Sequence, residues 1–312
     1  MGKLLNSHKR ARTAAVTCGD RAFFFHSLFR ALRGFGSIVF LLVSLALTSP
    51  AQDLEHLSKA IAGGSTEQKR DALFQIRNLR SESASRAAIP ALRDSDPIVR
   101  ATAAASVLFL PKQDAVAVLA PLLEDRDAFV RKEGAYALGR VESPDAAAPL
   151  IRILQRDKDL EVRAAAAVGL GRTGNTAAVE PLLAILKSRP SEETEFLRRA
   201  AARSVGQIAQ IVGTSDPYVV TPQNFLPDKY KRTDGLQDAS TRPGNGDAVP
   251  VLSAVLQNRQ DSDDTRREAA FALGAIGNPS AINVLRSYQN SPDPYLAEIS
   301  REALLRIEAG KK

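Results

Sequence analysis

Asp127-Ala-Phe-Val-Arg-Lys-Glu-Gly-Ala-Tyr-Ala-Leu-Gly139 is followed, 32 residues later, by Asp159-Leu-Glu-Val-Arg-Ala-Ala-Ala-Ala-Val-Gly-Leu-Gly171. Residues 96–100, Asp-Pro-Ile-Val-Arg, open a further copy of the same pattern. In the first copy the apolar and small residues recur three or four positions apart, which places them on one face of a helix. The pattern therefore predicts an amphipathic helix that returns at a fixed period along the chain.

The residue after the Val of each copy marks the period across the 312-residue chain. Successive markers lie 31, 31, 32, 35, 68 and 31 residues apart, and the 68-residue step equals one period plus an insertion. A stack of repeats tolerates an insertion as a loop on one face. We therefore expect about seven helix pairs, whose second helices carry the markers Lys69, Arg100, Arg131, Arg163, Arg198, Arg266 and Ala297.

Small residues recur near the end of each predicted second helix. A Gly at such a position fits a helix termination signal, and it also allows neighbouring units to approach closely. Both roles are expected for Gly139, Gly171, Gly206 and Gly274.

These residues resemble the HEAT repeat superfamily, most closely its short bacterial subtype named after phycobilisome lyase subunits, with the pattern D-x-x-V-R-x-x-A-A-x-A-L-G. The resemblance covers about residues 54–309. It implies an all-α fold, a right-handed α-α superhelix whose second helices line a concave face, with Asp and Arg joined in a ladder between repeats. It also implies a protein partner. Lys69 and Ala297 depart from the pattern in the first and last units, as expected of capping repeats.

The N-terminal segment has the order of a signal peptide. An apolar run at residues 38–47 follows Arg30 and Arg33 and precedes the small residues Ser49 and Ala51. We expect residues 1–51 to be a signal peptide cleaved near 51/52, and residues 52–312 to be an exported repeat domain of the periplasm or cell envelope. The alternative is a membrane anchor formed by uncleaved residues 35–50, although ten apolar residues fall short of the roughly 20 that span a bilayer.

Charge and inventory exclude several function classes. The formal net charge is +7, but residues 1–51 hold seven cations against one anion, so the remainder is nearly neutral and predicts no nucleic-acid binding. The single cysteine, Cys18, lies in the leader, and His56 is the only histidine after residue 51. We therefore predict no catalytic residues, no cofactor and no metal site. A HEAT-like family of iron-dependent hydroxylases relies on His-Glu pairs, and this sequence has none.

Two patterns have a structural explanation beside a functional one. Residues 169–174 match the G-x-G-x-x-G dinucleotide fingerprint, but they close a helix and follow no strand. The marker arginines would form a basic stripe, except that an Asp lies four residues before several of them on the same helical face. We expect these charges to pair locally in a structural ladder that comprises Asp96, Arg100, Asp127, Arg131, Asp159, Arg163, Arg198 and Arg266.

The irregular insertion at about residues 210–246 concentrates aromatic and basic residues in a chain that has few aromatics. Such a mixture anchors a partner in many interfaces, and it equally suits a loop folded back on the solenoid edge. Both interpretations remain open. The candidate partner-binding residues are Tyr218, Phe225, Lys229, Tyr230, Lys231 and Arg232.

The sequence thus predicts a non-catalytic, protein-binding scaffold of the cell envelope or periplasm, which binds through the concave helix face, the inserted loop or both. The alternative is an enzyme, or an accessory subunit of one, that acts on envelope material through carboxylates. A third hypothesis is a purely structural module. The pattern specifies neither the partner nor the oligomeric state.

Overall fold

The computed structural model describes residues 50–213 and 247–309. The chain divides into two units, residues 1–53 and residues 54–312, and the architecture below is that of the second unit. The predicted apolar leader and Cys18 lie outside the described residues. Helix α2 (Pro50–Gly63) contains the predicted cleavage position, residues 51/52, in its first turn.

The described residues form seven consecutive helix pairs, and they contain no strand. Several first helices begin or end in a short 3₁₀ segment. In chain order the pairs are α2 with α3 (Thr66–Leu79), α4 (Glu82–Ala88) with α5 (Pro97–Ser106), α6 (Lys112–Leu119) with α7 (Ala128–Val141), α8 (Ala147–Arg156) with α9 (Leu160–Thr173), α10 (Val179–Lys187) with α11 (Glu195–Gly213), α12 (Ala248–Gln257) with α13 (Asp263–Ile276), and α14 (Ile282–Arg286) with α15 (Pro294–Ala309). The prediction of an all-α solenoid of about seven pairs is confirmed.

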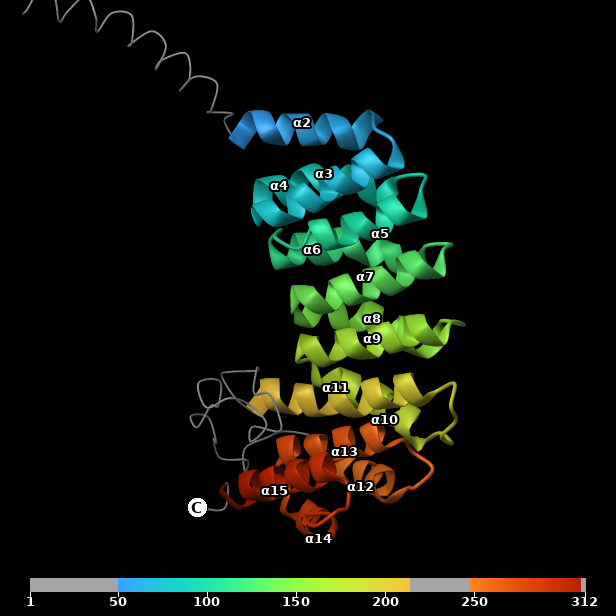
Figure 1. Cartoon of the computed structure of the whole chain (residues 1–312), viewed down its shortest axis with the longest axis vertical. Coiled ribbons are helices and arrows are strands. Elements are labelled where there is room, and N and C mark those ends of the chain that lie inside the picture. The colour runs from blue at the N-terminus through green and yellow to red at the C-terminus, as the bar shows by residue number, and fades with distance from the viewer. Residues whose placement is uncertain (1–49, 214–246, 310–312) are drawn as a thin grey trace, which may run out of the picture. The chain divides into compact units, whose positions relative to one another are not determined.

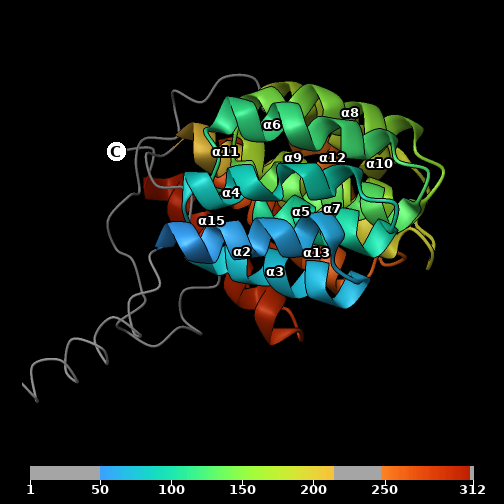
Figure 2. The ribbon, with the colours of Figure 1, turned by 90° about the horizontal axis from the view of Figure 1, so that it is seen from above.

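The pairs stack in two layers. Second helices pack on each other in the order α3, α5, α7, α9, α11, α13, α15, and from α5 onward each also packs on the first helix of its own pair (Figure 1). Seen from above, α6, α8 and α10 lie along one side of the stack, and α3, α5, α7 and α13 lie along the other (Figure 2). The apolar residue before five of the markers is buried in the core: these residues are Val99, Val130, Val162, Leu197 and Leu296, whereas Gln68, before Lys69, is exposed.

Capping side chains set where the second helices begin. The carboxylate of Asp127 accepts a hydrogen bond from the Phe129 N–H at 2.8 Å, and Asp96 and Asp159 cap α5 and α9 in the same way. These three carboxylates therefore satisfy free backbone donors of their own helices. The prediction that they pair with the Arg four residues later is wrong, because the side chain turns back to the helix N-terminus instead.

The recurring Gly residues bring neighbouring second helices together. A Cβ on Gly139 would lie 2.5 Å from the Cα of Gly169, so α7 and α9 touch backbone to backbone there. Their predicted role in helix termination is wrong: α7 continues to Val141 and α13 continues to Ile276. The residues that end these helices in the left-handed conformation are Glu142 and Gly277.

Helix α11 is longer than the sequence predicts. It runs without interruption to Gly213, and Gln210 within it is buried, so the regular fold extends past the predicted insertion boundary at about residue 210. The six candidate partner-binding residues from Tyr218 to Arg232 lie outside the described residues.

Candidate functional site

The marker arginines form ion pairs between successive helix pairs. The guanidinium of Arg100 donates to both carboxylate oxygens of Asp125 at 2.8 Å, and Arg131 grips Asp157 at 2.7 and 3.0 Å. Each acceptor is the residue that ends the first helix of the next pair. The remaining Nη1 of Arg100 donates to the backbone oxygen of Asp94, which ends its own first helix. One arginine therefore joins two pairs.

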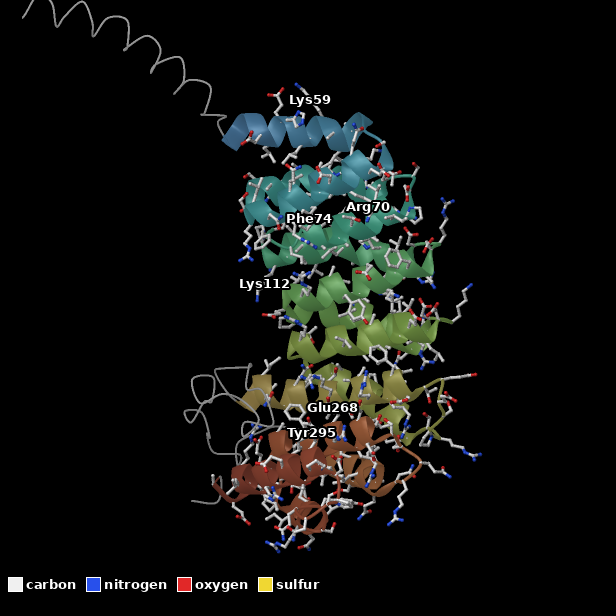
Figure 3. All side chains as sticks on the ribbon, viewed as in Figure 1. Lys59, Arg70, Phe74, Lys112, Glu268 and Tyr295 are labelled. Atoms are coloured by element: carbon white, nitrogen blue, oxygen red, sulfur yellow. The ribbon has the colours of Figure 1, made fainter. Side chains whose placement is uncertain are left out.

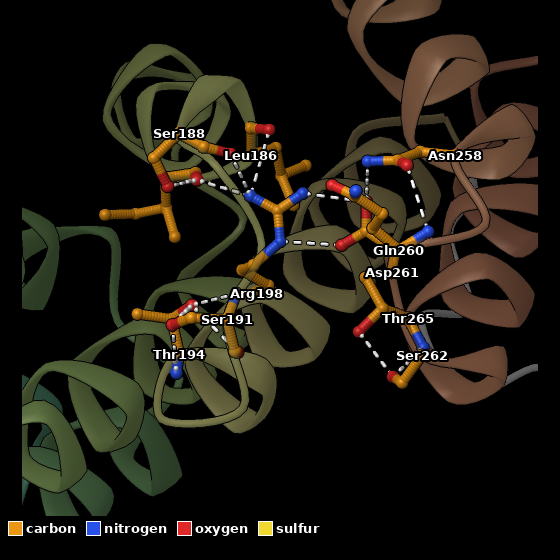
Figure 4. Close-up of polar contacts among 11 residues, drawn as sticks. Leu186, Ser188, Ser191, Thr194, Arg198, Asn258, Gln260, Asp261, Ser262 and Thr265 are labelled. Carbon is orange, nitrogen blue, oxygen red and sulfur yellow. Dashed lines mark hydrogen bonds and ion pairs between the residues drawn. The ribbon is translucent and has the colours of Figure 1, made fainter.

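The pair at α11 is the most buried of the series (Figure 4). Arg198 donates to the two carboxylate oxygens of Asp261 at 2.7 and 2.9 Å, and their side chains are only 2% and 1% exposed. Nη1 of Arg198 donates to three backbone oxygens, those of Ile185, Leu186 and Ser188. Every hydrogen bond that this charge needs is thus supplied by protein, as a buried charge requires.

Two marker arginines lack a carboxylate partner in the next helix pair. Arg163 donates from Nε to the Leu154 carbonyl, and its next first helix ends in Ser188, which has no carboxylate. Arg266 donates to the Leu256 carbonyl and to Asp263, and it stacks over the Tyr288 ring at 5.6 Å. The sequence signal that identifies the true acceptors is the residue two positions before the capping Asp, which is Asp in three successive pairs: Asp94, Asp125 and Asp157.

The electrostatics of these pairs are internal to the stack. Burial by itself raises the pKa of Asp157, but hydrogen bonds from Arg131 and the Asp159 backbone, with the Arg131 charge, outweigh it and lower the pKa overall. The same balance lowers the pKa of Asp125, and the hydrogen bond to Asp157 raises the pKa of Arg131. Since Arg100, Arg131 and Arg198 are each compensated by a carboxylate within the stack, these three arginines do not offer a basic surface to a ligand.

Exposed apolar side chains are concentrated on the layer of second helices. Among the described residues, none of the large hydrophobic side chains that are strongly exposed belongs to a first helix. Basic groups stack on several of these rings: Lys132 over Phe129, Arg199 over Phe196 and Arg267 over Tyr295, at 5.6, 5.2 and 5.3 Å. We call this layer the second-helix face; its exposed apolar residues are Phe74, Leu79, Ile98, Phe129, Phe196, Val212, Tyr295 and Leu305, while Phe109 lies in the turn after α5.

The second-helix face contains a hollow of about 610 Å³. It extends from Lys112 and Glu142, beside α7, across α9, α11 and α13 to Tyr295 on α15. Figure 3 labels Lys112, Glu268 and Tyr295 of this hollow, with Phe74 nearer the α2 end of the stack. The volume lies in the range of sites that bind small ligands or peptide segments, roughly 300–1,000 Å³.

Paired charges line the hollow. Arg172 donates to Glu142 at 2.6 Å, Arg203 to Glu268 at 2.8 Å, and Arg267 to both Asp264 and Asp293. Burial raises the pKa of Glu268, although the charge and the hydrogen bond of Arg203 oppose the shift. Glu268 therefore takes up a proton more readily than a solvated glutamate does.

The backbone is strained at one end of the hollow. Glu142 ends α7 with a φ of 52°, in the left-handed region that Gly174 and Gly277 occupy in other pairs. This conformation costs a non-Gly residue about 1 kcal/mol. Its carbonyl accepts from Lys112 and its carboxylate from Arg172, so both ends of this residue are held at the rim.

Two further features of the described residues bear on function. Nowhere in residues 50–213 and 247–309 do three or more His, Cys, Asp or Glu side chains gather in a way that would hold a metal ion. Within the same ranges, no helix combines the length and the apolar character that a membrane span requires.

Comparison with known proteins gives one match along most of the chain. The family model described as HEAT repeats matches residues 54–134, 85–170, 148–218 and 234–305. Among solved structures, an engineered protein shares 21% identity with a TM-score of 0.50, covering 82% of this chain and 70% of that one. The complex of CpcE and CpcF of phycocyanin lyase from Nostoc sp. PCC7120 shares 20% identity with a TM-score of 0.46, covering 85% and 96%. At these identities the likeness concerns the fold alone.

Curated relatives match over a short segment. Deoxyhypusine hydroxylase of Rattus norvegicus is 44% identical over 61 residues, and that of Homo sapiens is 39% identical over 61 residues. In both cases the match spans 20% of this chain and 20% of the relative.

Proposed function

This chain belongs to the HEAT repeat family, as its sequence pattern predicts, and we propose that it is a non-catalytic scaffold of the cell envelope or periplasm that binds a protein partner. The second-helix face is the proposed binding surface. The family membership itself describes the stack, since the shared positions are those that cap, pair and pack the helices.

The observation that carries the proposal is the one-sided distribution of exposed apolar side chains. Water-exposed rings such as Phe129 and Phe196, each 44% exposed, cost free energy unless something covers them in the functional state. Stacked cations beside the rings give the surface the mixed aromatic and basic character of interface anchors. Among the described residues, the first helices carry no strongly exposed large apolar side chain. This asymmetry supports the layer of second helices as the side on which a partner binds.

The envelope assignment rests on the sequence of the leader. An apolar run preceded by Arg30 and Arg33 and followed by small residues directs export and favours cleavage near 51/52. Fractionation of producing cells, with intact mass of the recovered chain, tests this part. A mass that retains residues 1–51 in the membrane fraction would support the alternative anchor at residues 35–50.

The binding surface is tested by replacing Ile98, Phe129 and Phe196 together with Ser in the full-length chain. We expect in-cell cross-linking followed by mass spectrometry to identify a partner of the wild-type chain, and the purified partner to bind the triple variant at least tenfold more weakly. The matched control replaces the exposed first-helix residues Gln113, Arg152 and Glu180 with Ser. Equal binding of the partner to both variants would remove the second-helix face from the proposal.

The inserted segment remains a second proposed contact. Its aromatic and basic residues, Tyr218 to Arg232, have the composition of an anchor. Substituting Tyr218, Phe225 and Tyr230 with Ser separates the two surfaces: a loss of affinity here, with the Ile98, Phe129 and Phe196 variant unaffected, would assign binding to the segment.

A second candidate function is catalysis through carboxylates. Two observations favour it: the local likeness to deoxyhypusine hydroxylases, which are enzymes, and Glu268, whose raised pKa in a hollow suits a proton-transfer group. Incubation of envelope preparations with the wild-type chain tests it by mass spectrometry of the products. An enzyme would yield a product that Glu268→Gln abolishes and Glu180→Gln preserves, whereas no product from the wild-type chain counts against catalysis.

A further inference from the structure

The hollow on the second-helix face has a shape that favours a chain over a compact molecule. Its lining begins beside α7 and ends on α15, which are four helix-to-helix steps apart. Packed helices lie 8–10 Å apart, so the hollow is on the order of 30 Å long. Because a volume of about 610 Å³ is distributed over this length, the hollow has a small cross-section, and we call it the furrow. An extended polypeptide of roughly nine residues spans the same distance.

The charges of the furrow argue for a ligand without a strong net charge. Its cations are already engaged: Arg172 with Glu142, Arg203 with Glu268, and Arg267 with two aspartates. Lys112 donates to a backbone carbonyl. A phosphate or another small anion needs an uncompensated positive charge, and an isolated ammonium needs an uncompensated negative charge, and these ion pairs offer neither.

Two side chains of the furrow have hydrogen-bonding groups that remain free, an amide and a guanidinium. The side-chain amide of Gln207 lines the furrow and has no hydrogen-bond partner among the described residues. Arg203 uses one Nη for Glu268 and is 55% exposed, so its other N–H groups face water. A primary amide offers two donors and one acceptor, which matches the donor and acceptor of a peptide group. The buried ring of Phe271 and the half-exposed ring of Tyr295 add apolar surface for side chains.

We propose that this furrow, from Lys112 and Glu142 to Tyr295, holds an extended segment of a partner polypeptide, with Gln207 and Arg203 meeting its backbone and Tyr295 and Phe271 meeting an apolar side chain. This inference rests on the proposed scaffold function and adds to it the form in which the partner is bound. The strained Glu142 fits this role, because its side chain and its carbonyl fix Arg172 and Lys112 at one end of the furrow.

The test uses a phage library of random twelve-residue peptides, selected on the full-length chain and counter-selected on an empty surface. Recovered peptides, labelled with fluorescein, are measured by anisotropy against three variants. We expect Tyr295→Ala and Gln207→Leu each to weaken binding at least tenfold. Arg152→Ala, which truncates an exposed side chain of the first helix α8 outside both the furrow and the second-helix face, should change affinity by less than twofold. Circular dichroism melting verifies that each variant is folded.

Three outcomes overturn the inference. The first is that no peptide is enriched over the empty surface, and the second is that the peptides bind Tyr295→Ala and Gln207→Leu as tightly as the wild-type chain. The third is that the furrow binds a compact molecule and no peptide. The last is recognised when the dye ANS shows enhanced fluorescence that Tyr295→Ala removes while no peptide is recovered. These failures differ from failure of the proposed function, because a partner that depends on Ile98, Phe129 and Phe196 would still bind the furrow variants.

Discussion

A marker arginine has one of two structural roles. The role depends on the side chain at the end of the first helix in the following pair. Where an Asp lies at or just after the end of that helix, as for Arg131 and Arg198, the guanidinium forms a bidentate ion pair that links two helix pairs. Where Ser188 lies there, Arg163 turns its Nε to a backbone carbonyl of its own pair. The same Val-Arg motif is thus expected to contribute a different amount to the free energy of unfolding at different places in the stack.

Replacing Arg198 with Ala should be among the most destabilising single changes in the stack. The substitution leaves Asp261 as an uncompensated buried charge and removes the hydrogen bonds that the guanidinium donates to backbone oxygens, which costs roughly 3–5 kcal/mol. Urea unfolding followed by circular dichroism measures the loss. The matched control is Arg163→Ala, the same substitution at a marker with no carboxylate partner, for which we expect about 1 kcal/mol or less. Similar losses for both variants would contradict the role of the buried ion pair.

The buried aspartates should make stability depend on pH in the acid range. The pKa values of Asp125 and Asp157 are lowered in the folded chain, so their contribution is complete above the unfolded pKa of about 3.9 and is lost as the pH falls through the folded pKa. We expect the urea midpoint to fall steeply below about pH 4. Asp157→Asn should have a lower midpoint at pH 7 and a shallower decline with acid. An acid decline as steep as that of the wild-type chain would contradict the assignment.

At the scale of the helix, capping side chains begin α3, α5, α7, α9 and α13, and Gly residues bring the second helices from α7 onward close to their neighbours. Asp127 caps α7, and Gly139 allows α7 to touch α9. Ends of first helices supply the acceptors of the ladder, so the loop between the two helices of a pair is a structural element in its own right. Ser188 ends α10 with the same extended backbone conformation as Asp157 at the end of α8.

Ser188→Asp should therefore restore the missing ion pair with Arg163. Because the backbone at residue 188 already has the conformation of the other acceptors, we expect a gain of about 0.5–1 kcal/mol in the free energy of unfolding. A double-mutant cycle with Arg163→Ala isolates the pair: the gain should vanish when the arginine is absent. A gain that persists without Arg163 would show that the introduced carboxylate acts by another contact.

At the scale of the whole molecule, the stack is one-dimensional, and the insertion interrupts the chain without interrupting the packing. Helices α11 and α13 pack together although the residues paired across them lie 63 to 65 positions apart in sequence. Three ion pairs cross this junction: Arg198 with Asp261, Arg199 with Asp264, and Arg203 with Glu268. Closing a longer loop costs only slightly more entropy, roughly 0.6 kcal/mol for each doubling of length, which such an interface readily offsets.

Replacing residues 214–246 with an eight-residue Gly/Ser linker should leave the stack intact. The contacts between α11 and α13 involve none of the removed residues, so we expect an unchanged helical signal per molecule and a melting temperature within a few degrees of that of the full chain. Circular dichroism measures both. Loss of cooperative melting in the deletion variant would mean that the removed segment stabilises the junction.

The order of the seven pairs, the helix starts and the small-residue contacts can all be predicted from the sequence, because they depend on residues within one period of each other. Asp127 and Val130 act on their own helix, and a 3.6-residue periodicity exposes them directly. The same reasoning assigns the acceptors of the ladder to the wrong aspartates, since a spacing of four on a helix suggests a local pair, whereas the side chain at the N-terminus turns to cap the backbone.

The ion pairs between different repeats and the furrow follow only from the three-dimensional arrangement. They include Asp125 rather than Asp96 as the partner of Arg100, the burial of Arg198 against Asp261, and the furrow that Gln207 and Tyr295 line together. Periodicity fixes which side of a helix is buried. It does not fix how far successive pairs rotate on each other, and that rotation sets which side chains of different repeats converge. The repeating unit and its stack are thus encoded in the residues of one period, while the geometry of stacking creates the surface on which a partner is proposed to bind.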